Sequence, residues 1–215
     1  MMKVPQKREQ LSRDDWLQAA LQTMRSAGID GVKVAPLAVQ LGVTTGSFYW
    51  HFRNRGELLD ELLGYWERTR TDMAIEEAKR FEGSPNDRIL FLMKQVMAGD
   101  LAGYDLPIWL WAQSDEVAGR AFQRALKKRF AFCAWMFRQA GFSKRQAENR
   151  GRMMVVYLMG ESTLIPKSAS GQADSIRQKH MILTAQPLAK NLSVDETRVV
   201  GVRRSSSRWP SREVG

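Results

Sequence analysis

Residues 37–55 read LAVQLGVTTGSFYWHFRNR, and this stretch decides the fold. It predicts two short helices, 35–41 and 45–51, separated by Gly42, because glycine accepts the positive φ of a tight turn without strain. Pro36 fits the first turn of the first helix, where its missing N–H is tolerated. Two short helices joined by a glycine turn predict a helix-turn-helix, whose second helix enters the major groove of DNA.

The residues of this stretch divide between a buried side and an outward side. Leu37 and Ala38 are expected to face inward on the first short helix, where the small alanine lets the two helices cross closely. Val43 is expected to fill the inside of the turn. Phe48 and Phe52 are four residues apart and share one helical face, which we expect to pack on the core.

The outward side carries small, hydroxyl and aromatic side chains. Short hydroxyl groups reach phosphates or base edges, and a glycine lets the backbone approach closely. Tyrosine, tryptophan and histidine donate to phosphates while their rings contact sugars and thymine methyls. A basic side chain beside the free N–H groups of the next helix also suits a phosphate. The predicted DNA-contacting residues in this stretch are Thr44, Thr45, Gly46, Ser47, Tyr49, Trp50, His51 and Arg55.

Residues 16–64 resemble the DNA-binding domain of TetR-family transcriptional regulators. The pattern of that family is I-A-x-x-x-G-V-S-x-G-x-x-Y-x-H-F-x-x-K-x-x-L. This chain carries it as Leu37-Ala38, Gly42-Val43-Thr44, Gly46, Tyr49, His51-Phe52, Arg55 and Leu58. The resemblance is specific, because small, aromatic and basic positions all fall at fixed offsets, and it is confined to the first part of the chain.

Two positions depart from the family pattern. Lys33 stands just before the first short helix, where the family usually has a threonine that caps the helix and contacts phosphate, so a longer charged donor replaces it. Arg55 stands where the family usually has lysine, so a basic side chain that can contact phosphate is still present at this position. The resemblance thus implies a set of phosphate contacts (Lys33, Thr45, Tyr49, His51, Arg55) and a set nearest to the bases (Thr44, Gly46, Ser47, Trp50).

The resemblance also implies partners. Members of the family bind a palindromic operator in double-stranded DNA as homodimers, and are commonly repressors that a small molecule releases. Their two long C-terminal helices form a four-helix bundle with the partner subunit. Residues 143–164 suit this role, since they are apolar nearly all round between Met153 and Met159, as a helix needs when it meets both its own core and a partner.

Helix signals continue through the rest of the chain, and nothing alternates as a β-strand does. The other predicted helices are 13–27, 56–81, 88–102, 106–113, 115–139, 143–164 and 175–190. The fold class is therefore all-α, with an N-terminal three-helix helix-turn-helix domain and a larger C-terminal helical domain for ligand binding and dimerisation. The predicted boundaries are 1–57 for the first, 58–190 for the second, and 191–215 for a Ser/Arg-rich disordered tail.

The amino-acid composition limits which binding partners and which cellular compartment we expect. Lys and Arg number 33 against 23 Asp and Glu, a net charge of +10 that favours an anionic partner, either nucleic acid or an acidic membrane face. The single cysteine, Cys133, cannot form an intramolecular disulfide. The N-terminus lacks the apolar core of a signal peptide, and no apolar run approaches the ~20 residues of a membrane span. We therefore expect a cytoplasmic protein without a membrane partner.

A stock of aromatic and methionine side chains after residue 88 is the candidate lining of an effector pocket, because such pockets are mainly apolar. The same residues could equally be core. An effector bound there would be a small hydrophobic molecule. The candidates are Met93, Met97, Tyr104, Trp109, Trp111, Phe130, Phe137, Met153 and Tyr157.

Two other classes of function compete with a DNA-binding regulator. An all-α enzyme that uses the aromatic cavity would need a nucleophile, an acid–base pair or a cofactor motif, and no recognised spacing places one beside His51. His180 is the only other histidine, so neither a metal site nor a cofactor is expected. A basic helical adaptor would instead coat any duplex without sequence preference.

Overall fold

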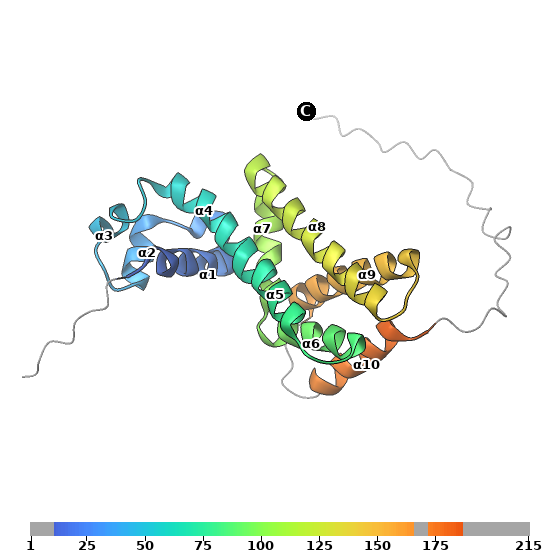
Figure 1. Cartoon of the computed structure of the whole chain (residues 1–215). Helices are drawn as coiled ribbons and strands as arrows, with labels where there is room; N and C mark the ends of the chain where they lie inside the picture. The colour runs from blue at the N-terminus through green and yellow to red at the C-terminus, as the bar shows by residue number, and fades with distance from the viewer. Residues whose placement is uncertain (1–10, 166–171, 187–215) are drawn as a thin grey trace, which may run out of the picture. The chain divides into compact units, whose positions relative to one another are not determined.

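The computed structural model describes residues 11–165 and 172–186, and these residues form helices and turns with no strand among them. Figure 1 shows the order of the helices along the chain. The elements are α1 (Arg13–Gly31), α2 (Val34–Gln40), α3 (Thr45–Tyr49), α4 (Arg55–Glu67), η1 (Arg68–Asp72), α5 (Met73–Arg80), α6 (Pro85–Ala98), η2 (Leu101–Tyr104), α7 (Asp105–Trp111), α8 (Glu116–Gln139), α9 (Lys144–Leu164) and α10 (Gln172–Thr184). The predicted all-α class is confirmed.

Helix α1 begins at a capping box. The Ser12 hydroxyl accepts from the Asp15 backbone N–H, and the Asp15 carboxylate accepts from the Ser12 N–H, so two backbone donors at the helix start are satisfied. At Gly28 φ is +68°, and the helical backbone is interrupted there, where the sequence predicts that the helix stops. The buried side of α1 includes Leu17, Leu21 and Met24, whereas Ala27 is exposed.

Helices α4, η1 and α5 form one continuous run, as the sequence predicts for 56–81 (Figure 1). Its start is capped by the Asn54 side chain, which accepts from the Glu57 N–H at 3.0 Å. Five apolar side chains of this helix are buried: Leu58, Leu59, Leu62, Leu63 and Trp66. Within the run, η1 is π-helical, an irregularity that occurs mostly at functional sites.

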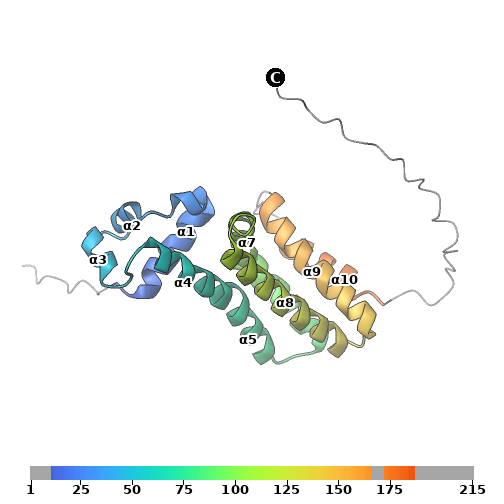
Figure 2. The ribbon, with the colours of Figure 1, turned by 90° about the horizontal axis from the view of Figure 1, so that it is seen from above.

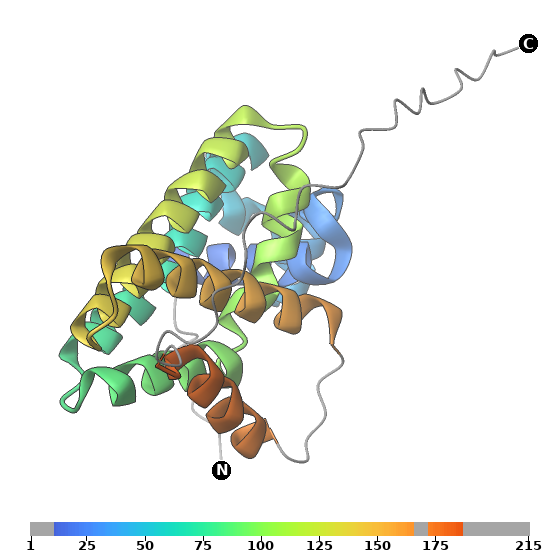
Figure 3. The same cartoon turned by 90° about the vertical axis from the view of Figure 1, so that its right-hand side faces the viewer.

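Helices α8 and α9 pack side by side and form the centre of the larger part (Figure 2). Gly151 makes their close approach possible, because a Cβ at this position would lie 2.8 Å from the backbone nitrogen of Ala134. Gly141, with φ of +91°, ends α8, and a capping box at Ser143 starts α9, both as predicted. Helix α10 packs against α6 (Figure 3).

Several boundaries shift from the sequence-based expectation. Helix α3 ends at Tyr49 rather than at 51, and the predicted helix 88–102 lies at Pro85–Ala98. The second shift has a local cause: the Ser84 hydroxyl accepts from the Asp87 N–H, and a proline follows the cap, where its missing N–H is tolerated. The predicted tail, 191–215, lies outside the described residues.

Two apolar cores hold the described residues together. The first joins α1–α4 to α7 and α8, and includes Trp66 stacked on Phe122 with ring centroids 6.1 Å apart. The second lies among α5, α6, α8, α9 and α10. No helix of the described residues is long and apolar enough to cross a bilayer.

Candidate nucleic-acid interface and cavity

Helix α3 is fixed from below by aromatic packing. Phe48 is fully buried, and its ring meets Trp16 edge-on at 5.3 Å and stacks on Phe52 at 5.3 Å. The backbone N–H of Val43 donates to the Ala38 carbonyl at 3.0 Å, which closes the turn between α2 and α3. The inward side predicted from the sequence is therefore present, and α3 rests on it as a short rigid element.

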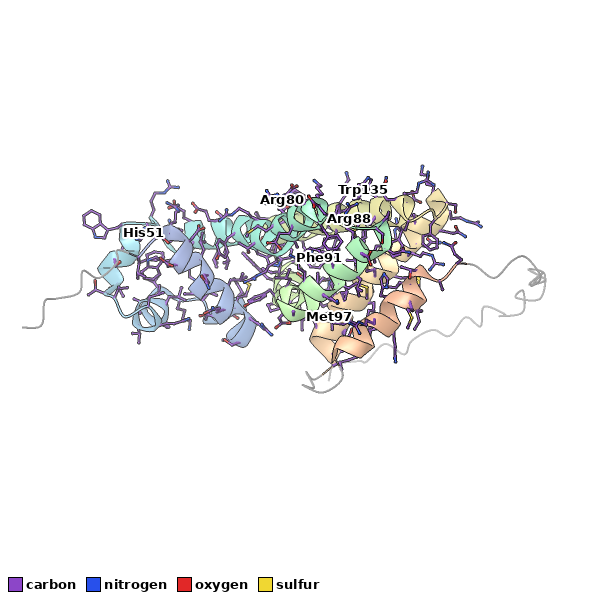
Figure 4. The ribbon with its side chains drawn as sticks, turned by 60° about the horizontal axis from the view of Figure 1, so that its bottom comes forward. His51, Arg80, Arg88, Phe91, Met97 and Trp135 are labelled. Carbon is purple, nitrogen blue, oxygen red and sulfur yellow. The ribbon has the colours of Figure 1, made fainter. Side chains whose placement is uncertain are left out.

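The opposite side of α3 is open. Trp50 is 87% exposed and Tyr49 is 63% exposed, although large apolar side chains are normally buried. Ser47 and His51 are half-buried, and Figure 4 labels His51 just beyond the end of α3. The remaining predicted residues on this side are exposed: Lys33, Thr44, Thr45 and Gly46. The predicted residues other than Arg55 are thus exposed or half-buried, within α3 or at the residues next to α2 and α3.

Two of these residues lie at helix N-caps without acting as side-chain caps. Lys33 occupies the N-cap position of α2 and Thr44 that of α3, and neither side chain makes a capping hydrogen bond. Threonine is a common cap residue, but at Thr44 only the position is that of a cap, since the hydroxyl makes no capping hydrogen bond. A hydroxyl that does not cap its own helix is left for another acceptor or donor.

Arg55 is placed differently from the rest. Its Nε donates to the Val32 carbonyl at 2.5 Å and its Nη2 donates to the Ile29 carbonyl at 2.7 Å. The side chain is half-buried and ties the start of α4 to the segment between α1 and α2. Its phosphate contact stays a prediction, and the geometry adds a role in positioning the helix-turn-helix.

A cluster of charged side chains stabilises the start of α4 on its solvent-facing side. Glu57 accepts from the Arg53 backbone N–H at 2.8 Å, from Arg53 Nε at 3.0 Å and from Arg13 at 2.8 Å. These hydrogen bonds, led by that from the Arg53 backbone, lower the pKa of Glu57 to about 2. Arg13 also pairs with Glu61 and lies over the Phe52 ring at 4.5 Å.

A cavity of about 50 Å³ lies between the α4–α5 run and helices α6, α8 and α9. Its walls are almost entirely apolar, with two arginines and a threonine among them. The lining residues are Arg70, Thr71, Ala74, Ile75, Leu92, Val96, Leu101, Ala102, Arg129, Phe132, Cys133, Met154, Val155, Leu158 and Met159. Burial raises the pKa of the Cys133 thiol to about 12, so this thiol is neutral.

None of the nine side chains predicted for the pocket lines this cavity. Some are core residues: Met93, Met97, Trp111 and Phe137. Others are exposed: Trp109, Met153 and Tyr157. Tyr104 and Phe130 are partly buried against the two cores. The physical reason is that the type of side chain does not decide the lining: Phe132, Met154 and Met159 line the cavity together with smaller aliphatic side chains, whereas other rings and methionines fill the cores.

The cavity also has a polar lining that was not predicted from the sequence. Arg129 donates from both Nη atoms to Asp105, at 2.6 and 3.0 Å, and from Nε to the Thr71 hydroxyl at 2.9 Å. Asp105 is 1% exposed, so this pair is a buried ion pair across α7, α8 and η1. Arg70 lies over the Tyr104 ring at 4.4 Å, and its Nε is buried with no hydrogen-bond partner. The signal that could have indicated this lining is the pair Arg70-Thr71, two polar residues that follow each other inside an otherwise apolar helical stripe.

Helix α9 carries an exposed apolar stripe. Met153 and Val156 are 61% and 60% exposed, and Tyr157 and Leu164 continue the same face at helical spacing. Gly160 lies within the stripe, and a Cβ built there would meet nothing within 4 Å. An open groove beside it is lined by α7, α8 and α9, with Trp109 on its α7 wall. This is the face that the sequence predicts for a partner subunit.

Comparisons with known proteins agree with the geometry at the N-terminus. Residues 17–62 match the family described as "Bacterial regulatory proteins, tetR family". The chain is 29% identical over 76 residues to the HTH-type transcriptional regulator AcrR of Shigella flexneri, covering 35% of each chain. It is 46% identical over 46 residues to the class A tetracycline repressor of Escherichia coli, covering 21% of each. These matches span about a third or less of the relatives' length.

Solved structures extend the likeness to the whole fold. A transcriptional regulator from Saccharomonospora viridis in complex with choline has a TM-score of 0.63 at 17% identity, over 78% of this chain and 92% of the other. FadR from Bacillus subtilis in complex with stearoyl-CoA has a TM-score of 0.61 at 16% identity, over 82% and 100%. At such identities the likeness concerns the fold. Residues 17–62 thus match the tetR family of bacterial regulatory proteins, and the fold resembles that of these solved regulators.

Proposed function

We propose that the protein is a transcriptional regulator that binds a specific DNA sequence and is not an enzyme. The observation that carries the proposal is the outward surface of α3: Tyr49 and Trp50 are largely exposed on a helix that Phe48 and Phe52 hold rigidly from below. Leaving two large aromatic side chains in water forgoes about 1.5–3 kcal/mol of burial each, which contact with DNA would recover.

On this surface, each side chain has a role that its chemistry allows. Tyr49, His51, Lys33 and Thr45 donate to phosphates, which fixes the orientation of α3 on the duplex. The groups nearest to the bases are Thr44, Gly46, Ser47 and Trp50. Arg55 positions α3 through the Val32 and Ile29 carbonyls and contacts phosphate with the donors that remain.

The regulator would act as a homodimer on a palindromic operator. The α9 stripe of Met153, Val156, Tyr157 and Leu164 supports this, because a soluble monomer gains nothing from a row of exposed apolar side chains on one helix. Gly160 leaves room for a second helix to approach. Two identical subunits related by a two-fold axis present two α3 helices, which a palindrome matches.

A small hydrophobic effector would release this repressor from the operator. The supporting observation is that Arg70, Thr71, Ala74 and Ile75 form one wall of the cavity on the same helical run that begins at Arg55. From Arg55 to Arg70 the run spans fifteen residues, so about 22 Å of helix separates the helix-turn-helix from the cavity. The cavity of about 50 Å³ is below the ~300–1,000 Å³ of small-molecule pockets, so an effector must displace this wall to enter.

The salt dependence of DNA binding tests the proposal. The logarithm of the affinity for a selected duplex should fall linearly with the logarithm of salt concentration, with a slope of about −0.9 for each phosphate contacted. Lys33→Ala should flatten this slope by about one unit and weaken all sequences alike, whereas Trp50→Ala should reduce the preference for the selected sequence. If the affinity changed neither with salt concentration nor with either substitution, the proposed DNA-binding surface would be wrong.

A further inference from the structure

The cavity is an apolar chamber with one unsatisfied cationic donor in its wall. We propose that it takes an amphiphilic monoanion, a molecule with an apolar chain or ring and a single carboxylate that Arg70 binds. The assignment to regulation rests on the proposed function, whereas the binding itself does not.

The walls select an apolar body. Apart from Arg70, Thr71 and Arg129, the lining consists of aliphatic and aromatic side chains with the neutral thiol of Cys133. Such walls offer no hydrogen bonds to a polyol or a nucleotide, and they favour a ligand whose carbon atoms leave water on binding.

The charge of Arg129 is already neutralised. Both of its Nη atoms donate to the buried Asp105 carboxylate, and its Nε donates to Thr71. Paired in this way, with a side chain 13% exposed, Arg129 retains little capacity for a second anion. It closes that side of the cavity and fixes the η1 segment in place.

Arg70 is the cation without such a partner. No ion pair joins Arg70 to any residue in the described ranges, and its Nε is buried without an acceptor. Its guanidinium instead lies over the Tyr104 ring at 4.4 Å, a contact that does not use its N–H donors as hydrogen bonds to a carboxylate would. A buried donor without an acceptor is unfavourable, and a carboxylate would satisfy it with a charge-assisted hydrogen bond.

The same lining disfavours cations. No carboxylate is among the side chains that line the cavity, and two carboxylates close to the lining are already paired: Asp105 with Arg129 and Asp100 with Arg25. A quaternary ammonium ligand would meet Arg70 and Arg129 with no anion to offset them. The choline seen in the structural relative from Saccharomonospora viridis therefore does not predict the ligand of this chain.

Three probes with one apolar chain and different head groups test the proposal: octanoate, octan-1-ol and octyltrimethylammonium. Binding to the purified full-length protein is measured by isothermal titration calorimetry. Octanoate should bind once per chain and more tightly than octanol by on the order of tenfold, and the ammonium compound should bind most weakly. Equal affinities for the three, a preference for the cation, or no binding of any probe would overturn the proposal.

Variants locate the binding site. Arg70→Met keeps the apolar stem and should abolish the preference for octanoate over octanol, while Arg70→Lys should keep part of it. Arg80→Met is the matched control, since Arg80 is exposed farther along the same helical run and lies outside the cavity lining (Figure 4). Ala74→Leu fills the cavity and should remove binding of all three probes. A preference that persists in Arg70→Met places the anion elsewhere.

The two proposals fail in different ways. If octanoate binding depends on Arg70 but the protein selects no DNA sequence, the proposed ligand class stands and the proposed role as a regulator is wrong. A protein that selects a DNA sequence but binds the three probes equally would retain the regulator and reject the ligand class.

Discussion

At the residue scale, the start of α4 is held by two arginines with separate tasks. Arg53 donates to the Glu57 carboxylate from its backbone and its side chain, in solvent. Arg55 turns inward to the carbonyls of Val32 and Ile29. The sequence places both arginines beside the helix-turn-helix, but it gives no signal of which one faces inward, because that depends on carbonyls more than twenty residues earlier.

Arg55→Ala should lower the free energy of unfolding by about 1–3 kcal/mol, because two charge-assisted hydrogen bonds to backbone carbonyls are lost. DNA affinity should fall and its salt slope should flatten by about one unit, because the proposed phosphate contact is lost as well. Chemical denaturation and anisotropy titrations at several salt concentrations measure both. A slope reduced by about one unit with unaltered stability would make Arg55 a simple phosphate contact.

Glu57 predicts an acid-dependent contribution to stability. Its folded pKa of about 2 lies below the ordinary 4.5, so the carboxylate stabilises the folded state above about pH 4.5, and the contribution is lost as the pH falls from 4.5 through 2. The difference in urea midpoint between the wild type and Glu57→Gln should therefore shrink over that range. Glu82→Gln, in the turn before α6, is the control. A difference independent of pH would contradict the ionic origin.

At the element scale, the α8–α9 pair depends on close backbone contact. A Cβ on Gly151 would lie 2.8 Å from Ala134 N and 3.1 Å from the carbonyl carbon of Cys133, so the two helices would have to separate. Gly64 of α4 offers a comparison, since a Cβ there meets nothing within 4 Å.

Gly151→Ala should destabilise the protein by about 1–3 kcal/mol through overpacking. Gly64→Ala should stabilise it by about 0.5–1 kcal/mol, because alanine loses less backbone entropy in a helix. Thermal unfolding of both variants tests the pair. If both substitutions stabilise, the contact between α8 and α9 is looser than the structure has it.

Element boundaries were predictable where a local signal marks them. Ser12, Asn54 and Ser143 each cap a helix with their side chains, and these residue types are the usual cap signal in a sequence. The start of α6 was placed three residues late, because the Ser84-Pro85 signal falls inside a stretch that reads as a turn. The interruption of the α4–α5 run by η1 has no sequence signal, since it arises where this run packs on α8.

At the scale of the whole molecule, one apolar core connects the helix-turn-helix to α7 and α8. The predicted domain boundary at residue 57 stays a prediction. The sequence predicts which helix faces are apolar, but it does not predict which faces meet, and the cavity is a space left between four helical segments. This is why the helix-turn-helix residues could be named from the sequence while the cavity lining could not.

Assembly is tested on the α9 stripe. Val156→Glu introduces a charge in the middle of the proposed interface and should convert the protein to monomers in sedimentation velocity. Met73→Glu changes an exposed apolar side chain of α5 in the same way and should leave the oligomeric state intact. A Val156→Glu protein that remains dimeric would move the interface away from α9.

The central claim, sequence-specific DNA recognition through α3, is tested most directly by selecting bound duplexes from a random pool. The wild type should enrich one sequence with two-fold symmetry and half-sites about 34–36 Å apart or a multiple of that spacing. Trp50→Ala should enrich it less. A pool that remains random, with uniform binding that disappears at higher salt, would contradict the claim.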